Sequence, residues 1–107
     1  MVIVFIKMRS LPEKCLELKQ TLKGLVVSAR NEKGCLNYDL FQDVENENSF
    51  CLVEQWESRK DLDGHLQSNT FAVIKGTRSL LSIEADIRTY EASHSERSAL
   101  KSLPRSG

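Results

Sequence analysis

The chain has 107 residues with 15 basic and 15 acidic side chains, so its formal net charge is zero. A chain of this length forms one domain. Because neither sign of charge predominates, the composition argues against nucleic acid or an anionic membrane as a partner. The longest apolar run, Val2 to Ile6, is far too short to cross a bilayer. No signal-peptide pattern is visible, and we therefore expect a cytoplasmic protein.

Three cysteines, Cys15, Cys35 and Cys51, lie in apolar patterns of the chain. An odd number of cysteines without a C-x-x-C pair indicates neither a disulfide framework nor a zinc site. We expect buried, inert thiols and no metal site.

The first strand is predicted from Val2 to Met8, and it is apolar on both faces for most of its length. A strand of this kind must be covered on two sides. Ser10 and Glu13 then have the spacing of a capping box, which predicts that a helix begins there. Apolar residues recur at steps of four and three and form one face of this helix: Leu11, Cys15, Leu18, Leu22, Leu25 and Ala29. Gly34 is expected to end it.

Two further strands are predicted from alternating residues on either side of a polar hairpin loop over residues 43–49. On the second strand, one face carries Leu36, Tyr38 and Leu40, and the other carries Cys35, Asn37, Asp39 and Phe41. The third strand is predicted from Phe50 to Glu57, and one of its faces carries Phe50, Leu52, Glu54 and Trp56.

Two short helices are expected next. Ser58, with Asp61 three residues later, indicates the start of a helix that covers Lys60 to Leu66. Ser68 or Asn69 can cap a second one. Both helices together occupy the place of a single helix in the element order.

The last strand is predicted from Ile83 to Tyr90, and residues 91–107 form a tail of different character. The polar composition of the tail is typical of a disordered segment. The alternative is that the tail packs on a neighbouring subunit and contains a helical turn near Arg97 to Leu103.

The order β-α-β-β-α-β over residues 1–90 predicts an α+β domain of the ferredoxin-like type, a four-stranded antiparallel sheet with helices on one face. Helices can cover only one side of such a sheet, yet its first three strands carry apolar residues on both sides. A second sheet from another copy would cover the other side. The sequence therefore predicts a homodimer.

The single Trp of the chain, Trp56, stands at the end of a predicted strand, and His65 follows nine residues later on a predicted helix. This places a flat apolar surface beside a titratable group, which suits a pocket for a small aromatic ligand. The spacing alone favours a simpler interpretation, in which Trp56 is a core residue and His65 a partly buried helix residue.

Three segments together resemble the antibiotic biosynthesis monooxygenase family, and within it the cofactor-free quinol monooxygenases. They are Gly34-Cys35-Leu36-x-Tyr38, Glu54-Gln55-Trp56-Glu57-Ser58, and Leu62-x-x-His65-Leu66-x-Ser68 with Phe71. The resemblance covers about residues 2–90, and the tail falls outside it. It implies a dimeric α/β barrel in which two sheets face each other, with a small-molecule cleft between each sheet and its helices.

The resemblance also implies an activity and a set of site residues. The activity is the oxygenation of a quinol or polyphenol by O2 without flavin, haem or metal. His65 is the candidate general base or hydrogen-bond partner, since an imidazole suits proton removal near neutral pH. Trp56 is a candidate pocket wall. The weaker candidates for substrate contact are Tyr38, Phe50, Phe71 and Arg88, and Glu54 could orient a polar group or pair with a cation.

Relatives that degrade haem share this scaffold, but their pattern is not present here. These relatives share an Asn on the first strand, which is absent from the first strand here, and His65 stands at the position of their Trp. Lys75 stands four residues after Phe71, at the place of their axial His. An ammonium group is a poor haem ligand, so the sequence argues against haem degradation.

Two other functions stay open at this point. The same scaffold could isomerise or break down a small signalling carbonyl compound, because a His beside a polar cleft serves proton transfer equally well. It could also be a non-catalytic, ligand-binding stress-response dimer, since one fold hosts many functions.

Overall fold

The computed structural model of the chain describes residues 1–104. Its strands are β1 (Val2–Arg9), β2 (Cys35–Gln42), β3 (Ser49–Trp56) and β4 (Asp86–Glu91). Its α-helices are α1 (Cys15–Ala29), α2 (Arg59–Leu66) and α3 (Asn69–Gly76). Short 3-10 helices are η1 (Pro12–Lys14), η2 (Thr77–Leu80) and η3 (Leu100–Ser102).

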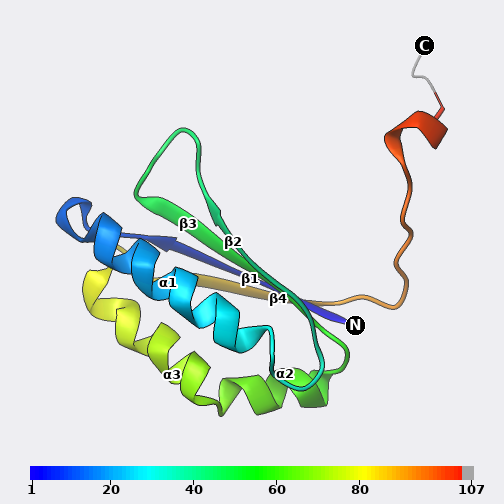
Figure 1. Ribbon diagram of the computed structural model, residues 1–107, viewed down its shortest axis with the longest axis horizontal. Helices are drawn as coiled ribbons and strands as arrows, with labels where there is room; N and C mark the ends of the chain where they lie inside the picture. The colour runs from blue at the N-terminus through cyan, green and yellow to red at the C-terminus, as the bar shows by residue number, and fades with distance from the viewer. Residues whose placement is uncertain (105–107) are drawn as a thin grey trace.

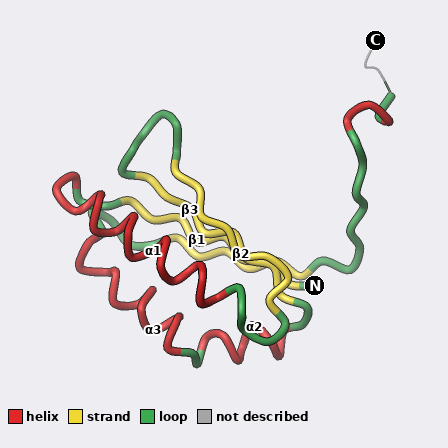
Figure 2. The backbone as a smooth tube through the Cα atoms, viewed as in Figure 1, coloured by secondary structure: helices red, strands yellow, loops and turns green. Residues whose placement is uncertain are grey.

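The strands form one antiparallel sheet in the order β2-β3-β1-β4. The helices α1, α2 and α3 all lie against the same face of this sheet (Figure 1). The predicted ferredoxin-like α+β architecture is therefore confirmed. The tube view shows the same two layers, with the β2–β3 loop projecting beyond the sheet (Figure 2).

The core fills the space between the sheet and the helices. Alternate residues of β1 point into it, namely Val2, Val4, Ile6 and Met8, and each is 3% exposed or less. From α1, the predicted stripe supplies Leu18, Leu22, Leu25 and Ala29. The spacing of apolar residues in the sequence thus determines which side of each element is buried.

The other face of the sheet carries no helix in the described part of the chain (Figure 1). At its centre, Phe5 of β1 pairs with the apolar Val53 of β3 on one side and with the charged Arg88 of β4 on the other. Phe5 also packs edge to face on Tyr90, with ring centroids 5.8 Å apart. We call this side the open face.

Both predicted serine caps are present. The Ser58 side chain accepts a hydrogen bond from the backbone N–H of Asp61 at the start of α2, and Ser68 accepts one from Phe71 at the start of α3. Each hydroxyl therefore satisfies one of the first-turn N–H groups that have no partner within the helix.

The predicted capping box at Ser10 is wrong. Ser10 is buried between strands, where its backbone N–H donates to the carbonyl of Asn48 at 2.8 Å and its hydroxyl lies 3.4 Å from the Asn48 side chain. Because this serine is used to tie β1 to the β2–β3 loop, the first helix begins later, with η1 and then α1. It also ends at Ala29 rather than near Gly34. Gly34 has a φ of 79° in the turn that leads into β2.

The predicted faces of Cys35 and Leu36 are exchanged. An irregularity in the β2–β3 register falls between Cys35 and Asn37, so Cys35 lies opposite Trp56 and packs on the core. Leu36 takes the extra position and is 49% exposed. A bulge of one residue has this effect because side chains alternate with a period of two.

The last strand begins at Asp86 rather than at Ile83. Before it, Leu81 makes an isolated bridge to Ser10 and Ile83 is exposed. After it, the tail runs away from the domain (Figure 1), and its described part, up to residue 104, holds only the short turn η3, inside the range predicted for one. Positions 105–107 of the predicted tail lie outside the described residues. No helix among residues 1–104 combines the length and apolarity that a membrane crossing requires.

Candidate functional site

The rings of Trp56 and His65 are stacked at one end of the layer between sheet and helices. Their centroids lie 4.6 Å apart and their planes differ by 28°. Trp56 is the last residue of β3, and His65 lies in the last turn of α2. The cap at Ser58 turns the chain sharply enough to bring the helix back over the strand end, so the predicted pairing of these two residues is present.

Two further aromatic rings meet His65 edge on. Tyr38 of β2 lies 5.6 Å from it and Phe71 of α3 lies 5.7 Å from it, measured between ring centroids. The imidazole is therefore enclosed by Trp56 on its face and by these two rings at other sides. We call Tyr38, Glu54, Trp56, His65 and Phe71 the aromatic cluster.

Glu54 is a buried carboxyl group within this cluster. Its Oε1 accepts a hydrogen bond from the indole Nε1 of Trp56 at 2.8 Å and lies 3.7 Å from His65 Nε2. Burial raises the pKa of Glu54, although the bond from Trp56 and the nearby His65 oppose that rise. The neutral carboxyl form is thus favoured compared with an exposed glutamate.

Three buried polar atoms of the cluster have no hydrogen-bond partner among the described residues: the Tyr38 hydroxyl, Glu54 Oε2 and His65 Nε2. Burial and the Glu54 carboxyl raise the pKa of Tyr38, which keeps it a neutral phenol. Buried polar atoms are rarely left without partners, and such exceptions point to function or to an absent ligand or water.

The other ring nitrogen of His65 is held by a residue that the sequence analysis missed. Both carboxylate oxygens of Glu32 lie 3.0 Å from His65 Nδ1. Glu32 lies in the turn between α1 and β2, and its side chain is 21% exposed. It is 33 residues from His65 along the chain, in a polar turn with no periodic pattern, so no local signal could have selected it.

Two predicted site residues lie outside the aromatic cluster. Phe50 is on the helix side of β3, but it pairs with Met8 at the opposite end of the sheet from the Trp56–Val2 pair. It lies six positions along the strand from Trp56, or about 20 Å. Arg88 lies on the open face, where it contacts Asp86.

A small hollow adjoins the cluster on the helix side. Its volume is about 200 Å³, and it lies between α3, β1 and the start of β4, with Phe71, Ile6 and Ile87 in its wall. Lys75, Arg78 and Glu84 supply its charged lining. Phe71 thus borders the hollow and packs on His65. Tyr38, Glu54, Trp56 and His65 are not in its wall and are each 1% exposed or less. Phe71 is thus the side chain of the cluster that borders the hollow.

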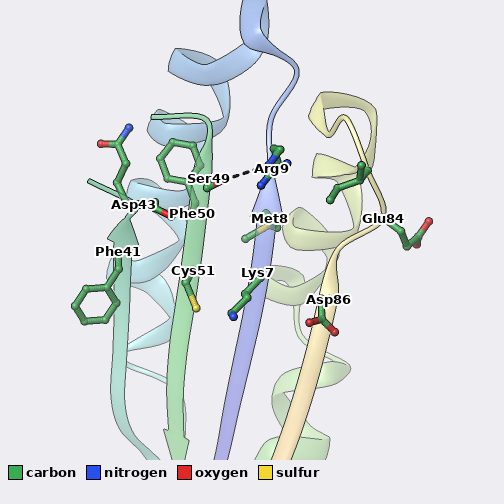
Figure 3. A pocket seen from close by; sticks show the side chains of 12 residues that line it. Lys7, Met8, Arg9, Phe41, Asp43, Ser49, Phe50, Cys51, Glu84 and Asp86 are labelled. Carbon is green, nitrogen blue, oxygen red and sulfur yellow. Dashed lines mark hydrogen bonds between the residues drawn. The ribbon is translucent and has the colours of Figure 1, made fainter. Parts of the chain in front are cut away.

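A larger hollow of about 540 Å³ lies on the open face at the Phe50 end of the sheet (Figure 3). Neighbouring strands present Phe41, Cys51, Lys7 and Asp86 side by side there. It is far from His65 and on the other side of the sheet, so it adds nothing to the chemistry of the cluster.

Comparison with known proteins identifies the family of this domain. The family model described as antibiotic biosynthesis monooxygenase matches residues 1–76, which include the whole aromatic cluster. The chain belongs to the antibiotic biosynthesis monooxygenase family. The family match indicates a monooxygenase-like function.

Three similar proteins illustrate how far the similarity extends. The YcnE protein of Bacillus subtilis is 36% identical over 77% of this chain and 87% of its own length. The protein sll1783 of Synechocystis is 29% identical over 79% of this chain, which spans only 58% of that relative. A solved structure from Deinococcus radiodurans, of a candidate antibiotic biosynthesis monooxygenase, has a TM-score of 0.84 at 25% identity and covers 92% of this chain and 99% of its own.

Within residues 1–104, no three His, Cys, Asp or Glu side chains are grouped so that they could hold a metal ion. The three cysteines are free thiols and each is partly buried.

Proposed function

We propose that the protein is a homodimeric, cofactor-free monooxygenase that oxidises a quinol-like or polyphenolic small molecule with O2. The observation that carries the proposal is the arrangement of His65. Its ring stacks on Trp56, its Nδ1 contacts Glu32, and its buried Nε2 has no hydrogen-bond partner within residues 1–104. A free imidazole nitrogen among aromatic walls suits a base for an aromatic alcohol.

The chemistry needs only a base, an aromatic substrate and O2. His65 Nε2 takes a proton from a substrate hydroxyl, and the resulting anion is electron-rich enough to reduce O2. One oxygen atom of O2 then bonds to a ring carbon of the substrate in place of its hydrogen, and the other leaves as water, so that a quinol and O2 give a hydroxyquinone and water. The apolar rings around His65 exclude solvent water, which strengthens interactions with the charged intermediate.

We assign substrate entry to the hollow beside α3. Its wall is largely apolar, and Phe71 alone of the cluster borders it. Rotation of the Phe71 side chain would join the hollow to the space next to His65. In this proposal Trp56, Tyr38 and Phe71 contact the substrate, whereas Phe50 and Arg88 have no part in binding it.

The homodimer is the second part of the proposal. A second copy would cover the open face, whose centre holds Phe5 and Val53 and whose margins hold Phe41 and Tyr90, 57% and 49% exposed. Exposed apolar patches of this kind mark interaction surfaces, and a self-complementary face gives a closed two-fold pair. We also propose a cytoplasmic location, where the three free cysteines would stay reduced.

Oxygen uptake with a reduced naphthoquinone tests the activity. We expect uptake above the enzyme-free rate, and a decrease of roughly 100-fold or more for His65→Ala, the scale of general-base catalysis. His94→Ala is the matched control, because His94 is exposed in the tail. Equal rates with and without wild-type protein would reject the proposal. Turnover of carbonyl substrates under anaerobic conditions would instead indicate isomerisation or breakdown of such compounds.

Sedimentation or light scattering tests the dimer. Val53→Asp places a charge at the centre of the open face and is expected to give monomers. Leu16→Asp is the matched control, because Leu16 is 66% exposed on α1 and lies on the helix layer. A wild-type chain that is a stable monomer at micromolar concentration would rule out the homodimer.

A second candidate function is favoured by one observation. The four innermost side chains of the cluster are fully enclosed, which suits a core as well as a catalytic site. A ligand-binding dimer without turnover would bind an aromatic compound in the hollow without displacing Phe71. A ligand-bound structure with Phe71 unmoved and no oxygen uptake would support this candidate.

A further inference from the structure

The contact between Glu32 and His65 is built by the main chain of a turn. The backbone N–H of Glu32 donates to the Ala29 carbonyl at 3.0 Å, and the Glu32 carbonyl accepts from Cys35 at 3.1 Å. These bonds fix the turn after α1 regardless of the glutamate side chain. The turn between the end of α1 and the start of β2 therefore places the Glu32 carboxylate against the His65 ring.

An ionised carboxylate can only accept hydrogen bonds. Because both Glu32 oxygens lie 3.0 Å from Nδ1, that nitrogen must carry the hydrogen of the neutral ring. The lone pair is then on Nε2, the buried nitrogen for which the described part of the chain offers no hydrogen-bond partner. A carboxylate behind a histidine commonly selects the tautomer and the orientation of the ring in this way.

The other polar groups around the ring do not compete for this role. Glu54 Oε1 is 3.7 Å from Nε2, too far for a hydrogen bond, and already accepts from Trp56. Burial favours the neutral form of Glu54 through its raised pKa, and the Tyr38 phenol is also neutral. Glu32 is therefore the carboxyl group whose oxygens both contact the ring, at 3.0 Å from Nδ1.

We propose that Glu32 is the positioning residue of His65: it holds the ring in the Nδ1–H form, leaves Nε2 as the base, and balances the positive charge when Nε2 takes a proton. This inference rests on the proposed function for its catalytic consequence. Its structural part, the tautomer of one ring, can be measured without any substrate.

Nitrogen-15 NMR of the histidine rings is the test, recorded at a pH where His65 is neutral. In wild type we expect a protonated Nδ1 and a bare Nε2 for His65. The exposed His94 in the same chain serves as an internal reference. Glu32→Gln keeps the size of the side chain but offers a donor as well as an acceptor, so the His65 signals should shift toward a mixture of tautomers. Glu32→Asp should retain the wild-type tautomer.

Kinetics then separate positioning from folding. Glu32→Gln is expected to lower kcat by roughly 10–100-fold with KM little changed, the usual scale for loss of a residue that orients another. Glu32→Asp should recover part of that loss because it restores the carboxylate. Lys33→Ala is the matched control, since Lys33 is the exposed neighbour in the same turn, and it should change neither the tautomer nor kcat.

The outcomes distinguish this inference from the proposed function. A wild-type His65 protonated at Nε2, or a tautomer unchanged in Glu32→Gln, would overturn the role of Glu32 even if oxygen uptake is found. The expected tautomer and its loss in Glu32→Gln would support the positioning role. If wild-type protein then consumes no oxygen, only the proposed reaction fails.

Discussion

The indole of Trp56 contacts His65 through its ring face and Glu54 through its N–H. The two ring centroids are 4.6 Å apart, and the indole Nε1 lies 2.8 Å from Glu54 Oε1. The same Glu54 oxygen is 3.7 Å from the Nε2 of His65. One side chain at the end of β3 thus fixes both an imidazole and a carboxyl group.

Trp56→Phe is expected to destabilise the protein by roughly 2–3 kcal/mol. The phenyl ring can still stack on His65, but Glu54 loses the hydrogen bond from the indole and the core loses volume. Urea unfolding measures the change. Tyr38→Phe is the matched control, because the Tyr38 hydroxyl has no hydrogen-bond partner among residues 1–104 and its loss should cost less than about 1 kcal/mol. Equal losses for both variants would contradict the role given to the indole N–H.

The stability of the protein should fall as pH rises through the ionisation of Glu54. Burial raises the folded pKa above the ordinary value of 4.5, so the unfolded chain releases this proton first. The contribution of Glu54 is fully present below the unfolded pKa and is lost as pH rises through the folded pKa. Glu54→Gln, an uncharged mimic, should match wild type in acid and become the more stable protein at higher pH.

Unfolding in urea from about pH 4 to about pH 8 measures this difference. Glu57→Gln is the control, because Glu57 is exposed just beyond the end of β3, and its difference from wild type should not vary in this way. A Glu54→Gln variant that loses stability relative to wild type as pH rises would show that the sign is wrong.

Two glycines should respond to alanine in opposite directions. Gly34 has a φ of 79°, and a Cβ there would collide with the side chain of Asp61. Gly34→Ala should therefore cost roughly 1–3 kcal/mol. Gly24 lies within α1 with open space around it, so Gly24→Ala should stabilise the protein by roughly 0.5–1 kcal/mol. Thermal unfolding of both variants checks the pair, and a stabilising Gly34→Ala would contradict the strained turn.

Phe71→Ala should open the aromatic cluster to small solutes. Phe71 borders the hollow beside α3 and packs on His65, which in turn stacks on Trp56. Because Trp56 is the only tryptophan, acrylamide quenching of its fluorescence reports access directly. We expect weak quenching in wild type and severalfold stronger quenching in Phe71→Ala. Val73→Ala, at a 45% exposed position of the same helix, should behave like wild type. Unchanged quenching in Phe71→Ala would remove the assigned entry route.

The fold could be predicted because its apolar periods are regular. Alternation along β3 correctly put Glu54 and Trp56 on one face, and the stripe of α1 correctly gave the buried side of that helix. The prediction failed where a single residue interrupts the regular spacing of apolar side chains or shifts the start of a helix. The bulge at Leu36 exchanged two side chains between faces, and the long-range bonds of Ser10 displaced the start of the first helix.

The candidate site could be predicted only in part. Trp56 and His65 belong to one strand–cap–helix unit, so their meeting follows from local structure. Phe50 shares a face with Glu54, yet strand length carries it to the other end of the sheet. Glu32 meets His65 only through the tertiary arrangement of α1, β2 and α2, which a linear pattern does not encode. The side of the sheet occupied by Arg88 depended on a register that sequence alone left undecided.

The first residue of the chain is held at the edge of the aromatic cluster. The Met1 amino group donates to the Ala92 carbonyl at 3.2 Å, the Met1 carbonyl accepts from Ala92 at 2.8 Å, and the next residue, Val2, pairs with Trp56. A purification tag (a handle) fused before Met1 would begin next to the aromatic cluster. A handle placed after the outlying tail (Figure 1) keeps that neighbourhood native, and assays of the variants above should be built on such a fusion.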